Sequence, residues 1–210
     1  MMLYRRVFGM FALATLVTLP ASSQVLRDDS HTWKLGLQGG AMVFQTRTQD
    51  YEAVPSVGAH LLVMAKRGGL MVGVDEGFGD DEQSGQIVFN DIRRYQAVLM
   101  AFPVAGKVEP YFGAGGGLLQ VVGPRVSSLV TDPLEREALL DAADDATTHA
   151  FATFLAGVQG KWGRTSVFVQ TQISTAPGSD KLLRGALYSF HGGIRIGLGS
   201  TREDVRAGGY

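Results

Sequence analysis

Cysteine is absent from the 210-residue sequence, so a disulfide framework, a thiolate metal site and a lipid-modified N-terminal cysteine are all excluded. Charge is scarce and balanced, because 19 Lys and Arg residues face 20 Asp and Glu residues and the formal net charge is -1. A chain with no net positive charge has no overall field that attracts nucleic acid, and no segment interleaves basic with aromatic residues. We therefore expect no nucleic-acid partner.

Long apolar runs are also missing after the first 20 residues. A helix needs roughly 20 consecutive apolar residues to cross a bilayer, and no later segment approaches that length. If this protein lies in a membrane, it crosses as strands.

The N-terminus has the three-part pattern of a secretory signal peptide. Two arginines precede a short apolar core that ends at Leu19, and a proline and three small residues follow. This order predicts cleavage after Ser23. We expect a signal peptide at 1–23, a linker at 24–32 and an exported mature protein. The alternative, an anchor helix in the inner membrane, requires a longer apolar core.

What the sequence does contain is glycine, at 28 residues, and a two-residue alternation of apolar with small or polar residues from Trp33 to Ser200. This period indicates β-strands. Short and long connections alternate between the segments, which is typical of an up-and-down barrel that spans a membrane. The eight predicted strands lie near 33–43, 56–63, 70–75, 94–102, 110–122, 149–159, 167–173 and 188–198. The short connections are 66–68, 105–107 and 161–164, and the long ones are 46–53, 79–86, 123–147 and 174–185.

The polar face of these strands decides which way the barrel is turned. It holds glycine, glutamine, serine, threonine and few charges, whereas a water-exposed exterior normally carries many Lys and Glu. A narrow interior needs small residues and a partner for each charge. We therefore predict that the apolar face points outward and that a polar network fills the lumen. Its predicted members are Lys34, Asp75, Arg94, Gln170, His191 and Arg195.

Aromatic residues gather near both ends of the predicted strands. Two interfacial girdles explain this distribution, and ordinary strand aromatics are the alternative. The predicted girdles comprise Trp33, Phe102, Tyr111 and Trp162 at the short-turn end, and Phe44, Tyr51, Phe78, Phe89 and Tyr188 at the long-loop end.

The signal peptide, the eight strands, the short turns and the run Pro110–Gly117 together resemble the small outer-membrane β-barrel families, OmpA-like and OmpX-like. The last strand is similar to the signal that such barrels present to the barrel-insertion machinery. His191, Gly193, Ile196 and Leu198 occupy the matching positions. The family signal usually ends the chain on an aromatic residue, whereas a polar tail follows here, at 201–210.

The resemblance covers 33–200 and implies an all-β fold, an eight-stranded antiparallel up-and-down transmembrane barrel in the cell outer membrane. It also implies partners: membrane lipid and lipopolysaccharide, and the insertion machinery during assembly. Barrels of this kind are commonly monomeric, so a monomer is expected.

The third long connection, 123–147, contains the signals of a short helix. Asp132 is placed as N-cap, Pro133 as first helical residue and Glu135 as capping-box partner. A helix of roughly three turns is predicted. It could act as a lid over the barrel, lie on the membrane or dock a partner.

Charged residues cluster in two kinds of connection. Asp75, Glu76, Asp80, Asp81 and Glu82 predict a solvated acidic loop, with loose divalent-ion bridging to lipopolysaccharide as the alternative. Basic residues at 66–67, 107, 161 and 164 are either solvated turn charges or contacts to phospholipid headgroups.

Evidence for catalysis is thin. The glycine run Gly113–Gly117 continues into another strand-like stretch, so it lacks the following helix of a phosphate-binding loop. Ser189 and His191 share a face and are the candidate catalytic pair, with Ser56 and His60 as a second pair. No carboxylate lies near them in sequence, and a hydrogen-bonded interior histidine is the simpler interpretation. No cofactor or metal is expected.

Three functions remain open. The first is an outer-membrane barrel with a structural, interaction or small-solute role, and not a wide pore, because eight strands enclose only enough space for side chains. The second is an outer-membrane lipid-modifying hydrolase that uses a Ser–His pair. The third is a soluble exported carrier, built like a lipocalin around an apolar ligand.

Overall fold

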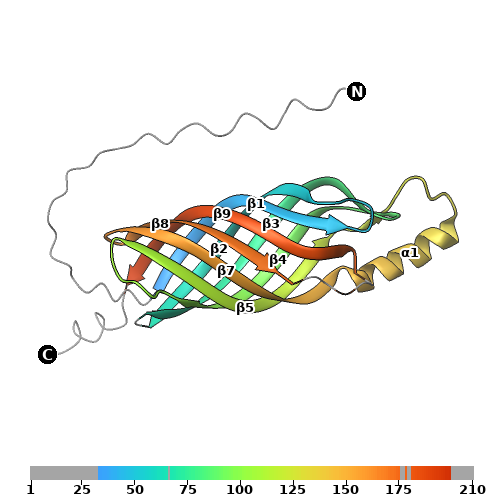
Figure 1. The fold of residues 1–210 in the computed structure, drawn as a ribbon. Helices are drawn as coiled ribbons and strands as arrows, with labels where there is room; N and C mark the ends of the chain where they lie inside the picture. The colour runs from blue at the N-terminus through green and yellow to red at the C-terminus, as the bar shows by residue number, and fades with distance from the viewer. Residues whose placement is uncertain (1–32, 66, 176–177, 179–180, 200–210) are drawn as a thin grey trace, which may run out of the picture.

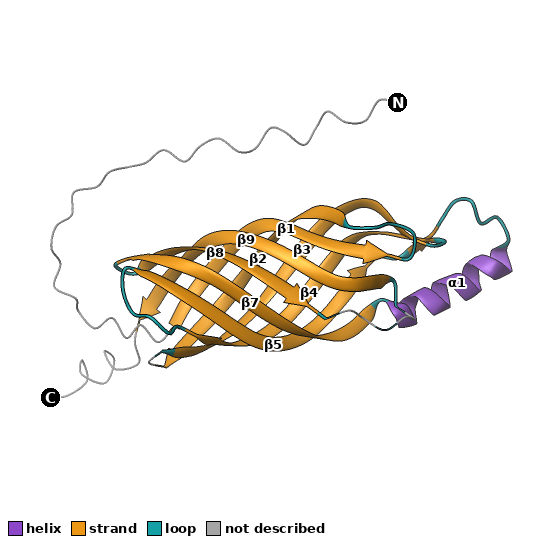
Figure 2. Ribbon diagram, in the orientation of Figure 1, coloured by secondary structure: helices purple, strands orange, loops and turns teal. Residues whose placement is uncertain are grey.

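The computed structural model describes residues 33–65, 67–175, 178 and 181–199. The predicted signal peptide, linker and polar tail lie outside this range. Eight long strands and one two-residue strand form a single sheet, and one helix stands beside it (Figures 1 and 2). The strands are β1 (Trp33–Thr46), β2 (Glu52–Ala65), β3 (Gly68–Ser84), β4 (Ile87–Ala101), β5 (Val108–Val122), β6 (Arg125–Val126), β7 (Thr148–Trp162), β8 (Thr165–Ser174) and β9 (Leu183–Gly199), and the helix is α1 (Pro133–Ala146). Among the described residues, no helix is long and apolar enough to cross a membrane.

The sheet closes into a barrel. Each long strand pairs antiparallel with its neighbour along the chain, β3 pairs with β4, and the first strand meets the last, as in Leu37 opposite Ile194. The short β6 pairs with the first two residues of β4, Ile87 and Val88, at the long-loop end of the barrel. The prediction of an all-β, eight-stranded antiparallel up-and-down barrel with one helix is therefore confirmed.

An apolar band covers the outer wall. On β5 it runs from Val108 to Leu118, which is about 33 Å of strand and about 25 Å of height at the usual barrel tilt. That height matches the hydrocarbon layer that outer-membrane barrels cross. The exposed members of the band are Leu35, Leu37, Val57, Leu70, Val72, Val74, Tyr95, Leu99, Val108, Phe112, Leu118, Phe154, Val158, Val167, Val169, Ile173, Phe190, Ile194, Ile196 and Leu198.

This outer wall contradicts the soluble-carrier hypothesis, which needs Leu35, Leu61 and Ile196 inside. Leu35 is 46% exposed and Ile196 is 48% exposed, and Leu61 lies on the same outward face of β2. A protein dissolved in water would leave this contiguous apolar surface uncovered.

Toward the long-loop end the barrel wall reverses its polarity. There, apolar side chains point inward and form an upper apolar cluster, which includes Met42, Phe44, Val54, Phe89, Ile92, Leu119, Val121, Phe151, Leu183 and Leu187. The prediction that Phe44 and Phe89 belong to a girdle is wrong, because both are buried inside the barrel. Above the band the inward positions of β1, β2, β4, β5, β7 and β9 become apolar, whereas β3 and β8 keep buried polar residues there, such as Ser84 and Ser174.

A second, lower apolar cluster fills the short-turn end of the lumen: Leu62, Met71, Val98, Met100, Phe102, Tyr111, Leu155 and Phe168. The girdle prediction is also wrong for Phe102 and Tyr111, which belong to this interior cluster. Trp33 and Trp162 are exposed at this end, as predicted.

The connection predicted at 79–86 is mostly strand. β3 continues to Ser84 and turns into β4 through Gly85, whose φ of +68° favours glycine. A register shift between Phe78 and Glu82 absorbs the extra residues. The acidic segment is thus only partly a solvated loop, because Asp75 lies in the lumen and Glu82 is buried.

The connection 123–147 contains the predicted helix. The Asp132 side chain accepts a hydrogen bond from the Leu134 N–H at 3.0 Å, and Pro133 opens α1. Ala143 and Ala146 pack against the upper apolar cluster. The rest of α1 projects past the long-loop end of the barrel (Figures 1 and 2).

Candidate functional site

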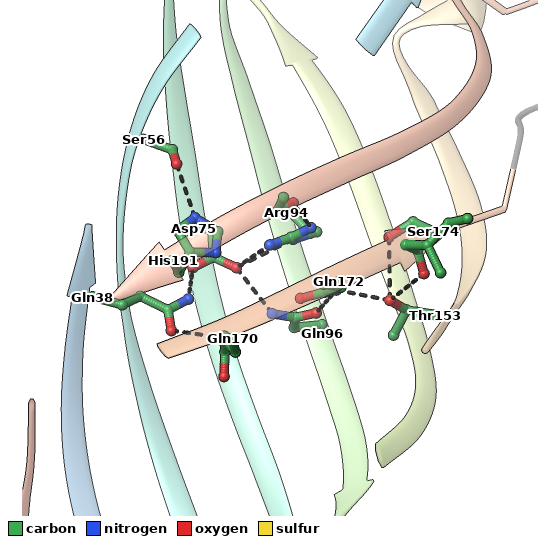
Figure 3. A network of polar contacts seen from close by, with 12 residues as sticks. Gln38, Ser56, Asp75, Arg94, Gln96, Thr153, Gln170, Gln172, Ser174 and His191 are labelled. Carbon is green, nitrogen blue, oxygen red and sulfur yellow. Dashed lines mark hydrogen bonds and ion pairs between the residues drawn. The ribbon is translucent and has the colours of Figure 1, made fainter. Parts of the chain in front are cut away.

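A buried carboxylate organises the middle of the lumen. Asp75, on β3, is 1% exposed and accepts hydrogen bonds from four donors (Figure 3). Arg94 donates through Nε at 3.2 Å and Nη2 at 2.9 Å, Gln96 donates at 2.9 Å, and Gln38 donates as well. Arg94 is itself fully buried. A buried charge pair is tolerated only with such saturated hydrogen bonding.

Strand register explains why these groups meet. Asp75 and Arg94 are direct partners across β3 and β4. On the other side Asp75 faces Gly58 of β2, where a Cβ would lie 1.9 Å from the Asp75 Oδ1. Gly58 therefore leaves the space that the carboxylate occupies.

From this pair the hydrogen bonds continue around the barrel. The Arg94 Nη1 donates to the Ser189 Oγ at 2.7 Å. The Gln172 Nε2 donates to the Gln96 Oε1 at 2.6 Å and to the Thr153 Oγ1 at 2.8 Å. With Gln38 of β1, side chains from six strands are thus joined by hydrogen bonds (Figure 3).

Arg195 forms the second charged centre, closer to the short-turn end. It is fully buried, and its guanidinium carbon lies 3.9 Å from the centre of the Phe168 ring and 5.0 Å from that of Tyr111. It donates to His60 Nε2 and to the Gln159 Oε1, each at 2.9 Å. Within the described part of the chain, no carboxylate pairs directly with it.

One amide links Arg195 to a carboxylate. Gln159 accepts from Arg195 and donates through Nε2 to Glu109 at 2.9 Å, and Lys161 donates to the same carboxylate at 2.7 Å. The Gln159 amide therefore lies between the two charges, with its oxygen toward the Arg195 guanidinium and its N–H toward the Glu109 carboxylate.

Gln170 joins the two centres into one network. Its Nε2 donates to the Gln38 Oε1 at 3.2 Å, and its Oε1 accepts from the Tyr111 hydroxyl at 3.0 Å and from Arg195 at 3.4 Å. The hydrogen bonds therefore run without interruption from Glu109 to Ser189. We call this connected set of side chains the polar layer.

All six residues predicted for the lumen network are buried on the inner face: Lys34, Asp75, Arg94, Gln170, His191 and Arg195. The sequence argument sets Lys34, Arg94 and Arg195 against Asp75, with Glu109 as a further acid, and the structure pairs Asp75 with Arg94 and joins Glu109 to Arg195 through Gln159. It did not identify the glutamines at 38, 96, 159 and 172, although their inward parity is visible in the sequence.

The serine that contacts His191 is Ser56 and not Ser189, the serine of the candidate pair. His191 Nε2 lies 2.8 Å from the Ser56 Oγ, while the Ser189 hydroxyl is occupied by Arg94. Asp75 interacts electrostatically with His191, but the His191 Nδ1 has no hydrogen-bond partner. A nucleophilic serine needs a histidine whose other nitrogen is oriented by an acceptor, and this arrangement lacks that contact.

Inward glycines produce these contacts, and only the strand register reveals them. Gly40 of β1 lies between Ser56 and His191, and without a side chain it lets them touch. Gly36 lies in the same way between His60 and Arg195, where a Cβ would be 2.3 Å from His60 Nε2.

The predicted assembly-signal residues all lie on β9. His191 is buried, whereas Ile196 and Leu198 face outward in the apolar band. Their recognition by the insertion machinery stays a prediction.

Comparison with known proteins establishes the fold alone. No protein-family model and no curated protein matches the sequence. Among solved structures, Neisserial surface protein A matches with a TM-score of 0.60 at 11% identity, over 80% of this chain and 97% of that one. The N-terminal β-barrel domain of Pseudomonas aeruginosa OprF matches with a TM-score of 0.41 at 9% identity, over 78% of this chain and 96% of that one. The outer-membrane enzyme PagL matches with a TM-score of 0.40 at 15% identity, over 76% of this chain and 98% of that one. The chain has the fold of the eight-stranded outer-membrane barrels.

Proposed function

We propose that this protein is an outer-membrane barrel with a closed interior and a structural or interaction role. The apolar band and the barrel fold support a position in the membrane. The short turns would face the periplasm, and α1 with its flanking loops would stand at the outer surface. The exported location rests further on the predicted signal peptide.

The interior carries the proposal. The polar layer adjoins the upper apolar cluster and is interleaved with the lower one, where Arg195 stacks on Phe168 and Tyr111. Its side chains are buried and hydrogen-bond mainly to one another. A water-filled conduit would have to cross both apolar clusters and break the Asp75–Arg94 pair. A barrel of eight strands normally has an interior filled by side chains. Passage of solutes is therefore disfavoured, and the surface at α1 is the part available to a partner.

Two measurements test the proposal. First, separated cell membranes are extracted with detergent, and gel mobility is compared before and after boiling. We expect recovery in the outer membrane with a heat-dependent shift, and recovery in the soluble periplasm would refute the membrane position. Second, the folded protein is added to planar lipid bilayers. We expect no steady conductance, and stable open channels would refute the closed interior.

A lipid-modifying hydrolase is the second candidate, supported by the contact between Ser56 and His191. Both side chains lie inside the lumen, so lipid would have to enter the barrel to reach them. The test is phospholipid and lipopolysaccharide hydrolysis by the folded protein and by Ser56→Ala, with Ser189→Ala as the matched control. Activity that Ser56→Ala removes and Ser189→Ala keeps would establish the hydrolase, and its absence from the unaltered protein would exclude these substrates.

A further inference from the structure

We propose that the short-turn end of the barrel binds the headgroups of anionic phospholipids through a ring of three exposed cations, Arg67, Lys107 and Arg164. The inference rests on the proposed function, because it requires the barrel to lie in a bilayer. Each cation comes from a different turn: β2 to β3, β4 to β5, and β7 to β8. They are therefore distributed around the rim.

Backbone hydrogen bonds hold each cation at its place on the rim. The Arg67 carbonyl accepts from the Phe102 N–H at 2.8 Å, and the Lys107 carbonyl accepts from the Lys161 N–H at 2.8 Å. The Arg164 carbonyl accepts from the Gly197 N–H at 2.7 Å. The ring is thus part of the barrel wall, and its spacing is fixed by the strand register.

The three side chains are available to a ligand. No ion pair joins them to a carboxylate in the described part of the chain, and Arg67 donates only to the Pro103 carbonyl, at 3.3 Å. Lys161, in the same turn as Arg164, is different because Glu109 neutralises it. Lys161 is therefore not a member of the ring.

The depth of the ring identifies the occupant. Val108, directly after Lys107, is 63% exposed, and Trp162, two residues before Arg164, is 66% exposed. These side chains end the apolar band, and tryptophan prefers the headgroup level of a bilayer. In a bilayer, cations that begin where the apolar band ends lie at the level of the phosphate groups. A soluble anionic polymer could bind cations at any height on the barrel, so it does not explain this position.

The opposite end of the barrel has the opposite charge character. Acidic residues outnumber basic ones around α1 and the β3–β4 turn, with Asp141, Asp144 and Asp145 all exposed. An anionic surface is repelled there and attracted at the ring. Among the described residues, charge complementarity to an anionic surface is therefore found at the short-turn end.

The test measures unfolding in urea of the full mature chain in vesicles of phosphatidylcholine and in vesicles that also contain phosphatidylglycerol. The variant Arg67→Gln/Lys107→Gln/Arg164→Gln is compared with a control of equal charge change at the other end, Arg47→Gln/Lys181→Gln/Arg184→Gln. Each cation near an anionic surface strengthens attachment roughly five-fold. We expect phosphatidylglycerol to raise the folding constant of the unaltered chain and the control by up to about a hundred-fold, a gain that added salt removes. The ring variant should lose most of it.

Three outcomes would overturn the inference. They are an equal gain for the ring variant, an equal loss for the control, and a gain reproduced by inorganic phosphate with phosphatidylcholine vesicles at matched ionic strength. The heat-dependent mobility shift in phosphatidylcholine alone separates the two proposals. A chain that inserts there without any preference for phosphatidylglycerol refutes the ring and leaves the proposed function standing, whereas a chain that does not insert refutes both.

Discussion

At the scale of single residues, two glycines on neighbouring strands have opposite requirements. A Cβ at Gly58 would lie 1.9 Å from the Asp75 Oδ1 and 2.8 Å from the Val74 carbonyl oxygen, whereas at Gly39 the nearest atom would be 3.8 Å away. We expect Gly58→Ala to lower the free energy of unfolding by about 1–3 kcal/mol, because overpacking displaces the carboxylate. Gly39→Ala should be near neutral. Urea unfolding in detergent micelles measures both, and equal effects would contradict the packing argument.

Arg195 is a buried cation whose hydrogen-bond acceptors include the side chains of His60 and Gln159. In Arg195→Glu a carboxylate would face the lone pairs of His60 Nε2 and Gln159 Oε1, which now accept from the guanidinium. We expect a loss of roughly 3–5 kcal/mol, the usual penalty for an unpaired buried charge.

The matched control is Arg195→Met, which keeps much of the stacking on Phe168 and removes the buried charge. Its loss should be smaller, since replacing buried charge by apolar volume is often tolerated. The temperature at which the fast-migrating gel form disappears reports both variants. An unchanged temperature for Arg195→Glu would rule out a stabilising role for this centre.

At the scale of elements, the β3–β4 hairpin buries one of the acids that the sequence suggested would be solvated. Burial raises the pKa of Glu82 above its ordinary value, and hydrogen bonds from the Asp80 N–H and Gln49 oppose the rise only in part. Ionisation is therefore easier in the unfolded chain. The hairpin is most stable below the ordinary carboxyl pKa and loses stability as pH rises through the raised one.

Glu82→Gln should remove this dependence and slow hydrogen exchange in the hairpin at neutral pH. Asp81→Asn is the control, because Asp81 is exposed and pairs with Arg125 on the surface. Hydrogen exchange of the hairpin amides at mildly acidic and neutral pH measures the effect. If Glu82→Gln kept the pH dependence of the unaltered chain, another group would be responsible.

The elements also show how far the sequence could lead. Alternation predicted every long strand, because a face of Leu, Val and Ile between glycines leaves little choice of period. It failed at 79–86, where a register shift and a tight glycine turn let acidic residues remain in a strand. Composition alone could not show this, since the same residues are typical of a solvated loop. The helix in 123–147 was predictable because Asp132 and Pro133 are local signals.

At the scale of the whole molecule, the lumen could be predicted in composition but not in connectivity. Parity placed Asp75 and Arg195 inside, yet their partners depend on which strands the closed sheet makes adjacent. Ser56 and His191 are 135 residues apart and meet only because β1 lies between their strands. The reversal of wall polarity was missed for a related reason. Alternation identifies the apolar face of a strand segment, but it does not tell whether that face points outward or into the lumen.

That reversal predicts two kinds of response to the loss of an aromatic ring. Phe89, in the upper apolar cluster, is fully buried by protein, so Phe89→Ala should leave a cavity and reduce stability by about 3–5 kcal/mol. Phe154 is 62% exposed on the apolar band, where detergent or lipid can fill the space that Phe154→Ala leaves. Its loss should be clearly smaller, although the same atoms are removed. Urea unfolding of both variants in the same micelles provides the comparison, and membrane insertion should persist in each. Equal losses would mean that the interior above the band is not packed like the core of a water-soluble protein, and the proposed closed interior would lose the support of the upper apolar cluster.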